Sequence, residues 1–201
     1  MATGPNLLTA SQSDFEDGTV GGWGNWTNAT VTNTTTQANT GTHSLSIAAI
    51  ATADTAVFIT NIPVVGGSTY RQSCWFRPAT TARSCSVYLQ FYDNTSTQVG
   101  PNNVATVTDT AGVWTQLSQT WTAPPTAVTA RIGPYIAAVP AGEVHYMDTV
   151  YLQLSGVTPA WKDWRAGTTP GLTQTTIRER TLAALATYVT GTNPDGTTKG
   201  S

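Results

Sequence analysis

Charged residues are scarce in this chain. Of its 201 residues, 9 are Lys or Arg and 11 are Asp or Glu, which gives a formal net charge of −2 at pH 7. A chain without a polybasic surface is not expected to bind nucleic acid or an anionic membrane surface. Long apolar runs are missing as well, since none approaches the roughly 20 residues of a membrane-spanning helix. We therefore expect neither nucleic acid nor a membrane as a partner.

The features of a secretory signal are missing from the first residues. The opening stretch MATGPNLL has neither the basic region nor the apolar run of such a signal. This predicts either that a signal has been removed or that the protein leaves its cell by another route, such as lysis.

Histidine and cysteine are equally rare, with two of each. His43 and His145 are too few for a histidine-based metal centre or a catalytic triad, and no nucleophile elbow, phosphate-binding loop or Cys-x-x-Cys pair occurs. Paired carboxylates for glycoside hydrolysis would have to come from Asp93, Asp109 and Glu143, all of which lie next to predicted turns. We therefore expect that the protein is not an enzyme.

Threonine is the abundant residue, at about a fifth of the chain. Its branched side chain suits half-exposed strands, and 18 Gly and 11 Pro supply turns. This composition is typical of an all-β sandwich. A threonine-rich disordered stalk is the alternative, but seven Trp, seven Tyr and regular apolar alternation argue against it for residues 6–155.

Seven segments have the alternating pattern of strands, and no helical pattern precedes residue 170. Regular spacing of this kind predicts a two-sheet jelly-roll β-sandwich over residues 1–155. The predicted strands are 44–50, 56–62, 70–77, 85–93, 113–122, 127–137 and 144–154.

The chain changes character after residue 155. Residues 156–172 are predicted to form a linker and residues 173–191 an amphipathic helix, which Thr176 and Glu179 begin with a capping-box pattern. The apolar stripe of a lone helix needs a partner. The helix could dock on its own domain, pair with a second copy in a homo-oligomer, or dock on a different protein, such as a virion or scaffold protein. Residues 192–201 are predicted to be a flexible tail.

Short motifs follow one another in a fixed order along residues 6–154. Each is weak alone, but the ordered set resembles carbohydrate-binding modules of families 4, 9 and 22. The motifs are NLL (6–8), DFEDG (14–18), GW (22–23), GTHSL (41–45), STY…SCW (68–75), W…L (114–117) and G…YMDTV (142–150).

The resemblance implies a structural calcium ion beneath the point where the first and last strands meet. Its side-chain ligands would be Glu16 and Asp148, and Asp14 or Asp17 could add oxygens. Calcium takes six to eight oxygen ligands, and a carboxylate with apolar neighbours in sequence is costly to bury unpaired. The alternative is ordinary turn chemistry, in which Asp14 and Asp17 cap loops.

Alternation within the strands predicts which side chains face outward. In 85–93, Cys85 and every second residue after it face the core, so Ser86 and every second residue after it face outward. If 70–77 pairs with 85–93 as a hairpin, Cys74 lies opposite Cys85, either as a disulfide or as two buried thiols. The predicted outward ligand-binding surface consists of Arg71, Trp75, Tyr88, Gln90, Tyr92, Arg131 and Tyr135.

Aromatic faces can stack on a pyranose ring, while amide and guanidinium groups bond its hydroxyls. This surface is therefore interpreted as a glycan-binding face. An exposed aromatic patch also suits a protein–protein interface. Two further readings stay open: a loop or the C-terminal helix covers these residues, or Trp75 belongs to the core and the hairpin register is off by one.

Two hypotheses about biological context remain. In the first, the chain is a bacteriophage virion protein, a minor tail or capsid-decorating component that binds host-surface glycan or a neighbouring virion subunit. In the second, it is the carbohydrate-binding module of a secreted bacterial enzyme that degrades polysaccharide. Three features favour the virion over a secreted, extracellular location: the missing signal, the threonine- and glycine-rich composition of low charge, and the predicted C-terminal helix.

Overall fold

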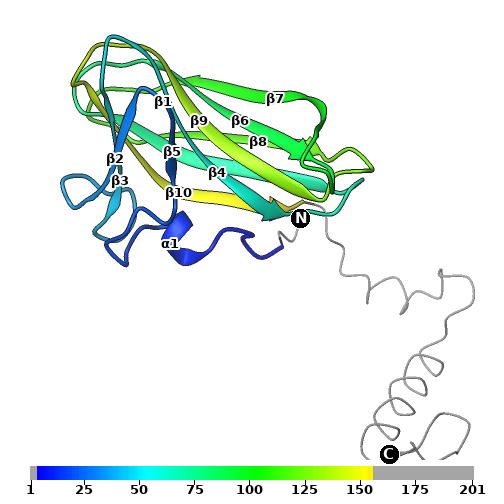
Figure 1. The fold of residues 1–201 in the computed structure, drawn as a ribbon. Coiled ribbons are helices and arrows are strands. Elements are labelled where there is room, and N and C mark those ends of the chain that lie inside the picture. Colours follow the sequence, from blue (N-terminus) through cyan, green and yellow to red (C-terminus); the bar gives the residue numbers. More distant parts are fainter. Residues whose placement is uncertain (1–3, 156–201) are drawn as a thin grey trace, which may run out of the picture. The chain divides into compact units, whose positions relative to one another are not determined.

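The computed structural model describes residues 4–155, which form ten strands and one short helix (Figure 1). The predicted linker 156–172, helix 173–191 and tail 192–201 lie outside the described residues. Within the described range, no helix has the length and apolar character needed to cross a membrane. The elements are α1 (Ala10–Ser13), β1 (Gly24–Thr27), β2 (Ala29–Thr34), β3 (Ser44–Ala49), β4 (Ala53–Pro63), β5 (Thr69–Pro78), β6 (Ser84–Tyr92), β7 (Gln98–Thr108), β8 (Thr115–Thr122), β9 (Thr129–Val139) and β10 (Val144–Leu154).

The strands form two five-stranded antiparallel sheets. Sheet I has the order β1-β4-β9-β6-β7 and sheet II the order β2-β3-β10-β5-β8. Figure 1 shows the two sheets as layers facing each other. The core lies between them, because alternate side chains of each strand point to the same face. Val87, Leu89 and Phe91 of β6 and Met147 of β10 are fully buried there. The predicted all-β, two-sheet sandwich is confirmed.

All seven predicted strands are present, and three further strands were not predicted. β1 and β2 are short and polar, so they lack a clear apolar alternation. β7 contains Gly100 and Pro101, which argue against a strand. It is nevertheless an edge strand of sheet I, where proline is tolerated because one side of the backbone needs no partner.

The predicted hairpin of 70–77 with 85–93 is wrong. β5 lies in sheet II between β8 and β10, whereas β6 lies in sheet I between β9 and β7. Cys74 is paired with Leu117, and Cys85 with Val107 and Ile136. The five residues between the strands can span about 17 Å, which exceeds the roughly 10 Å between packed sheets. They are therefore long enough to carry the chain from sheet II to sheet I, where a hairpin would have kept both strands in one sheet. Both cysteines still point inward, buried as free thiols.

The two ends of the described chain lie side by side. The backbone N–H of Leu7 donates to Leu152 O at 2.8 Å, and that of Gly4 donates to Leu154 O at 3.0 Å. The Asn6 amide bonds β10 from the side, donating to Val150 O and accepting from the N–H of Leu152, both at 3.0 Å. The resemblance implied that the first and last strands meet, but β1 and β10 lie in different sheets. It is the segment before the first strand that meets the last strand.

Candidate functional site

Five of the seven predicted ligand-binding residues share the outer face of sheet I. Tyr88, Gln90 and Tyr92 come from β6, and Arg131 and Tyr135 from β9. The register places Gln90 directly opposite Arg131, and directly opposite residues in a sheet point to the same side. The rings of Tyr88 and Tyr135 meet edge to face, with centroids 5.8 Å apart.

Arg71 and Trp75 do not belong to this surface. Both lie on β5, so they face outward from sheet II on the other side of the sandwich. Arg71 Nε donates to Ser118 Oγ at 2.9 Å, and Trp75 is paired with Gln116 and Asp148. Alternation within a strand gives the side on which a residue lies, but not the sheet to which the strand belongs. The prediction of one surface containing all seven residues is therefore wrong.

Trp26 completes the face and was not predicted. The β1 register shifts between Asn25 and Thr27, so Trp26 has no partner on β4, and such an irregularity redirects a side chain. Its ring reaches across β4 to β9, where a Cβ built on Gly133 would lie 2.7 Å from Cζ3. Its centroid is 5.9 Å from that of Tyr88 in an edge-to-face contact. Only a glycine at position 133 lets the indole lie across the sheet.

Arg131 lies among aromatic rings in the middle of the face. Its guanidinium carbon is 5.6 Å from the ring centroid of Trp26, 5.3 Å from that of Phe58 and 5.4 Å from that of Tyr92. Cation–π contacts of this kind hold the side chain in place. Its buried Nε has no hydrogen-bond partner among residues 4–155. Phe58 shares the alternation of predicted strand 56–62, so parity within that strand could have revealed it.

The polar groups of the face form a short network. Gln90 Nε2 donates to Asn102 Oδ1 at 2.8 Å and to Gln98 Oε1 at 3.2 Å, while the Tyr92 hydroxyl donates to Gln90 Oε1 at 3.3 Å. Gln98 and Asn102 come from β7, the edge strand that the sequence did not reveal. We use the term aromatic face below for Trp26, Phe58, Tyr88, Gln90, Tyr92, Asn102, Arg131 and Tyr135.

The aromatic face is hollowed in two places. One pocket of about 300 Å³ is lined mainly by rings and amides: Trp26, Thr27, Ala56, Tyr88, Gln90, Asn102 and Tyr135. A second, of about 110 Å³, lies beside Arg131 and Tyr92 and is otherwise lined by polar residues of β4, β9 and the turn after β6. Apolar walls with a few converging polar groups are typical of small-ligand sites, and stacking rings beside amides match the faces and hydroxyls of a sugar.

Tyr135 is held at the rim of the larger pocket by Asp54. The hydrogen bond from the tyrosine hydroxyl to the Asp54 carboxylate raises the pKa of Tyr135 to about 12, with burial adding to the effect. The same bond, followed by one from the N–H of Ala138, lowers the pKa of Asp54. The tyrosine is therefore a neutral donor and the aspartate an anion over the ordinary pH range.

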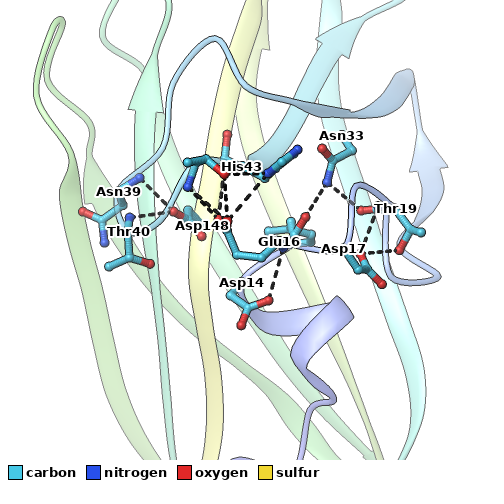
Figure 2. A network of polar contacts seen from close by, with 12 residues as sticks. Asp14, Glu16, Asp17, Thr19, Asn33, Asn39, Thr40, His43 and Asp148 are labelled. Atoms are coloured by element: carbon cyan, nitrogen blue, oxygen red, sulfur yellow. Dashed lines mark hydrogen bonds and ion pairs between the residues drawn. The ribbon is translucent and has the colours of Figure 1, made fainter.

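The two predicted metal ligands lie together at one loop, far along the chain from each other (Figure 2). The Glu16 carboxylate accepts hydrogen bonds from the N–H groups of Thr42 and His43 and from the Thr42 hydroxyl, at 2.8–3.1 Å. These backbone donors, His43 first, lower the pKa of Glu16 to about 2. A Cβ at Gly41 would lie 2.3 Å from Glu16 Oε1, so the loop approaches the carboxylate through a glycine with φ of 65°.

Asp148 binds the first residues of the same loop. Its Oδ2 accepts from the N–H groups of Asn39 and Thr40 at 2.8 and 3.0 Å, and Oδ1 accepts from that of Thr149 at 2.6 Å. The side chain is fully buried. Burial raises the pKa of Asp148 more than these bonds lower it, and the charge of Glu16 adds to the rise. We call Glu16 and Asp148 the carboxylate site.

The carboxylate site matches calcium in its donor chemistry. Two hard, anionic oxygen donors converge, and calcium prefers such ligands. Within residues 4–155, no lysine or arginine forms an ion pair with either carboxylate, and the one basic side chain near them is His43, whose Nδ1 is 3.6 Å from Glu16 Oε2. The carboxylate oxygens already accept N–H bonds, so a cation would share oxygens that are engaged. Asp14 and Asp17 instead bond local turn groups, as the turn-chemistry alternative predicted.

The described residues thus define a β-sandwich of the carbohydrate-binding-module fold, with an aromatic, amide-lined outer face. Residues 9–135 match the family model described as a carbohydrate binding domain, of the type numbered 4 and 9. The chain belongs to this family of carbohydrate-binding domains. No curated protein sequence matches the chain.

Solved structures show the same fold at low sequence identity. The xylan-binding domain CBM22-1 from Paenibacillus barcinonensis Xyn10C aligns with a TM-score of 0.60 and 18% identity, covering 77% of this chain and 97% of that one. TmCBM61 in complex with β-1,4-galactotriose gives 0.55 and 15%, covering 74% and 97%. The enzymatically active domain of tailspike protein 4 from bacteriophage CBA120 gives 0.57 and 15%, covering 74% of this chain but 21% of that one.

Proposed function

We propose that this protein is a non-catalytic component of a bacteriophage virion, in a minor tail or capsid-decorating position, that binds host-surface glycan through the aromatic face. The observation that carries the proposal is the pocket of about 300 Å³ in which Trp26, Tyr88 and Tyr135 stand beside the amides of Gln90 and Asn102. Stacking surfaces and in-plane hydrogen-bonding groups are present in one place, as a pyranose requires.

The virion setting has separate support. A phage tailspike domain has the same fold in part of its length, and the low charge and threonine-rich composition suit an exposed virion component. Binding at one site is expected to be weak, and display in many copies on a particle would raise the avidity. The second candidate is a module of a secreted polysaccharide-degrading enzyme, favoured by the xylanase modules among the structural neighbours.

A structural calcium at the carboxylate site is part of the same proposal. Glu16 and Asp148 would hold it, and the ion would supply the positive charge that these two neighbouring anions lack. Its role would be to fix the loop of residues 39–43 against β10.

Glycan-array and host cell-wall binding test the proposed function. We expect the Tyr88→Ala, Tyr92→Ala double variant to bind at least roughly tenfold more weakly, because central aromatic residues dominate binding energy at interfaces. Trp75→Ala is the matched control, since it removes a comparable ring from the outer face of sheet II. Equal binding by the wild type and the double variant would refute the glycan face. Burial of this face under a neighbouring subunit would make it an assembly surface.

A further inference from the structure

A second group of chemically active side chains lies inside the sandwich, away from both the aromatic face and the carboxylate site. Cys85 of β6, Asp109 just after β7 and His145 of β10 are each at most 1% exposed. One ligand atom from each lies within 4.8 Å of the other two. Cys85 Sγ is 3.3 Å from Asp109 Oδ2, and His145 Nδ1 is 2.7 Å from the same oxygen. We call these three residues the buried cluster.

We propose that the buried cluster supplies three ligands to a zinc ion that links sheet I to sheet II. Thiolate, imidazole and carboxylate are the ligands that zinc takes in proteins, at about 2.0–2.3 Å. Tetrahedral placement at those lengths sets ligand atoms about 3.3–3.6 Å apart. The Sγ–Oδ2 distance of 3.3 Å is already close to this, whereas the Nδ1–Oδ2 contact of 2.7 Å would have to open by roughly 0.6–0.8 Å.

The residues around the buried cluster form the outer shell that a zinc ligand set needs. A metal-bound histidine usually donates its other ring N–H to a carboxylate, and His145 Nε2 is 3.0 Å from Glu143 Oε1. Arg83 fixes that glutamate with two bonds of 2.8 Å, from Nε and Nη2. The backbone N–H of Arg83 donates to Asp109 Oδ1 at 2.6 Å, which orients the second ligand.

The net charge of the buried group is the same with and without the metal. Without it, each nitrogen of His145 shares a hydrogen bond with a carboxylate oxygen, and the thiol of Cys85 is neutral because burial, with the charge of Asp109, raises its pKa. Zinc would replace the proton on Sγ and the proton shared by Nδ1 and Asp109 Oδ2. Two positive charges leave as protons and two arrive with the ion, so the net charge does not change.

Only the outer end of the network reaches the surface. The Arg83 side chain is 23% exposed and that of Glu143 9%, whereas those of His145 and Asp109 are 0%. The metal therefore has to be offered while the sheets come together. The full 201-residue chain should be refolded with Co²⁺ or Zn²⁺ in a calcium-containing buffer, so that calcium occupies any site at Glu16 and Asp148.

We expect the refolded wild type to show a thiolate-to-cobalt charge-transfer band and to retain zinc after dialysis. Cys85→Ala should abolish the band, whereas Cys74→Ala, which removes the other buried free thiol, should keep it. Glu143→Gln should weaken zinc binding by about 10- to 100-fold, as loss of an outer-shell carboxylate does. Asp109→Asn keeps the size of the side chain and should remove the rise in melting temperature that zinc gives the wild type.

Absence of the band in the refolded wild type would overturn the proposal. So would equal loss of the band in Cys74→Ala and Cys85→Ala. If Cys85→Ala fails to give a cooperative melt, the Asp109→Asn comparison decides: an equal zinc-dependent shift in wild type and variant refutes the site.

Discussion

The outer faces of the two sheets carry similar residues but differ in what surrounds them. On sheet I, Arg131 lies among three aromatic rings, and the adjoining surface is hollowed into pockets. On sheet II, Arg71 is bonded to Ser118, and Trp75 stands beside Asp148, which the loop of residues 39–43 covers. An aromatic ring and an arginine are therefore not enough to make a binding face, because their surroundings decide whether they are available to a ligand.

The difference follows from how the neighbouring strands are built. At the edge of sheet I, separated from β9 by β4, the irregular β1 sends Trp26 across Gly133, which leaves apolar walls open to solvent. Next to β5, β10 has a bulge after Asp148. Backbone N–H groups of the 39–43 loop donate hydrogen bonds to Asp148 there. One face is thus shaped for a ligand and the other for holding the chain together. The predictions below test this contrast, from the largest expected effect to the smallest.

The largest effect is expected from Asp148→Ala, measured by thermal unfolding in excess chelator. The change leaves three backbone N–H groups of Asn39, Thr40 and Thr149 without their acceptor. Unsatisfied buried donors cost about 1–3 kcal/mol each, and the partial exposure of the loop limits the sum to about 3 kcal/mol, or roughly 10 °C. Asp148→Asn retains one oxygen and should lose less. Unchanged glycan binding at a temperature where the variant is folded would show that the loop held by Asp148 stabilises the fold without contributing to the aromatic face.

Removal of calcium should give the next largest effect. An ion that binds only the folded state adds about 2.7 kcal/mol when its free concentration is 100 times its Kd, which corresponds to roughly 5–10 °C here. Melting curves in calcium and in chelator would show this shift for the wild type. Asp148→Asn and Glu16→Gln should show a much smaller one. A wild-type curve that chelator does not move would remove the calcium proposal and leave the loop held by its hydrogen bonds to Glu16, Asp148 and Thr149.

Sequence alternation predicted the core and the sides of the strands, but not the strand partners. Tyr88, Gln90, Tyr92, Arg131 and Tyr135 were placed correctly because each follows the parity of its own strand. Arg71 and Trp75 were assigned to the wrong surface because a five-residue connection can either form a hairpin within one sheet or pass from one sheet to the other. The alternation within the two strands is the same in both cases. Trp26 was not found because the alternation breaks where the β1 register shifts.

The carboxylate site came from a different source of information. Glu16 and Asp148 are 132 positions apart in the sequence, so no local pattern could bring them together. The family resemblance did so, and the structure places both at the 39–43 loop. The buried cluster could not be anticipated at all, because its three residues come from three separate elements and each looked like an isolated turn or core residue.

A smaller effect is expected from Gly133→Ala. The new Cβ would lie 2.7 Å from the Trp26 ring, which has to move out of the pocket wall. We expect glycan binding to weaken about tenfold, equivalent to about 1.4 kcal/mol, with little change in melting temperature. Gly24→Ala is the matched control, because its Cβ would make an ordinary 3.7 Å contact with Phe58. Similar binding by both variants would show that Trp26 does not shape the ligand site.

The smallest effect concerns the charge state of Tyr135 at the rim of the larger pocket. The Asp54 carboxylate raises the pKa of this tyrosine to about 12 from an ordinary 10.0. A raised pKa contributes stability that is fully present below pH 10 and is lost as the pH rises through about 12, a small contribution because Asp54 is exposed to solvent. Asp54→Asn should shift one tyrosine to a lower pKa in an ultraviolet titration. It should leave glycan binding at neutral pH within about twofold, because Tyr135 stays a neutral donor. Trp75→Ala, on the opposite sheet, should leave that titration unchanged. A titration of wild type and Asp54→Asn that superimposes would show that Asp54 does not hold the ring, and the rim of the pocket would then depend on Trp26 and Tyr88 alone.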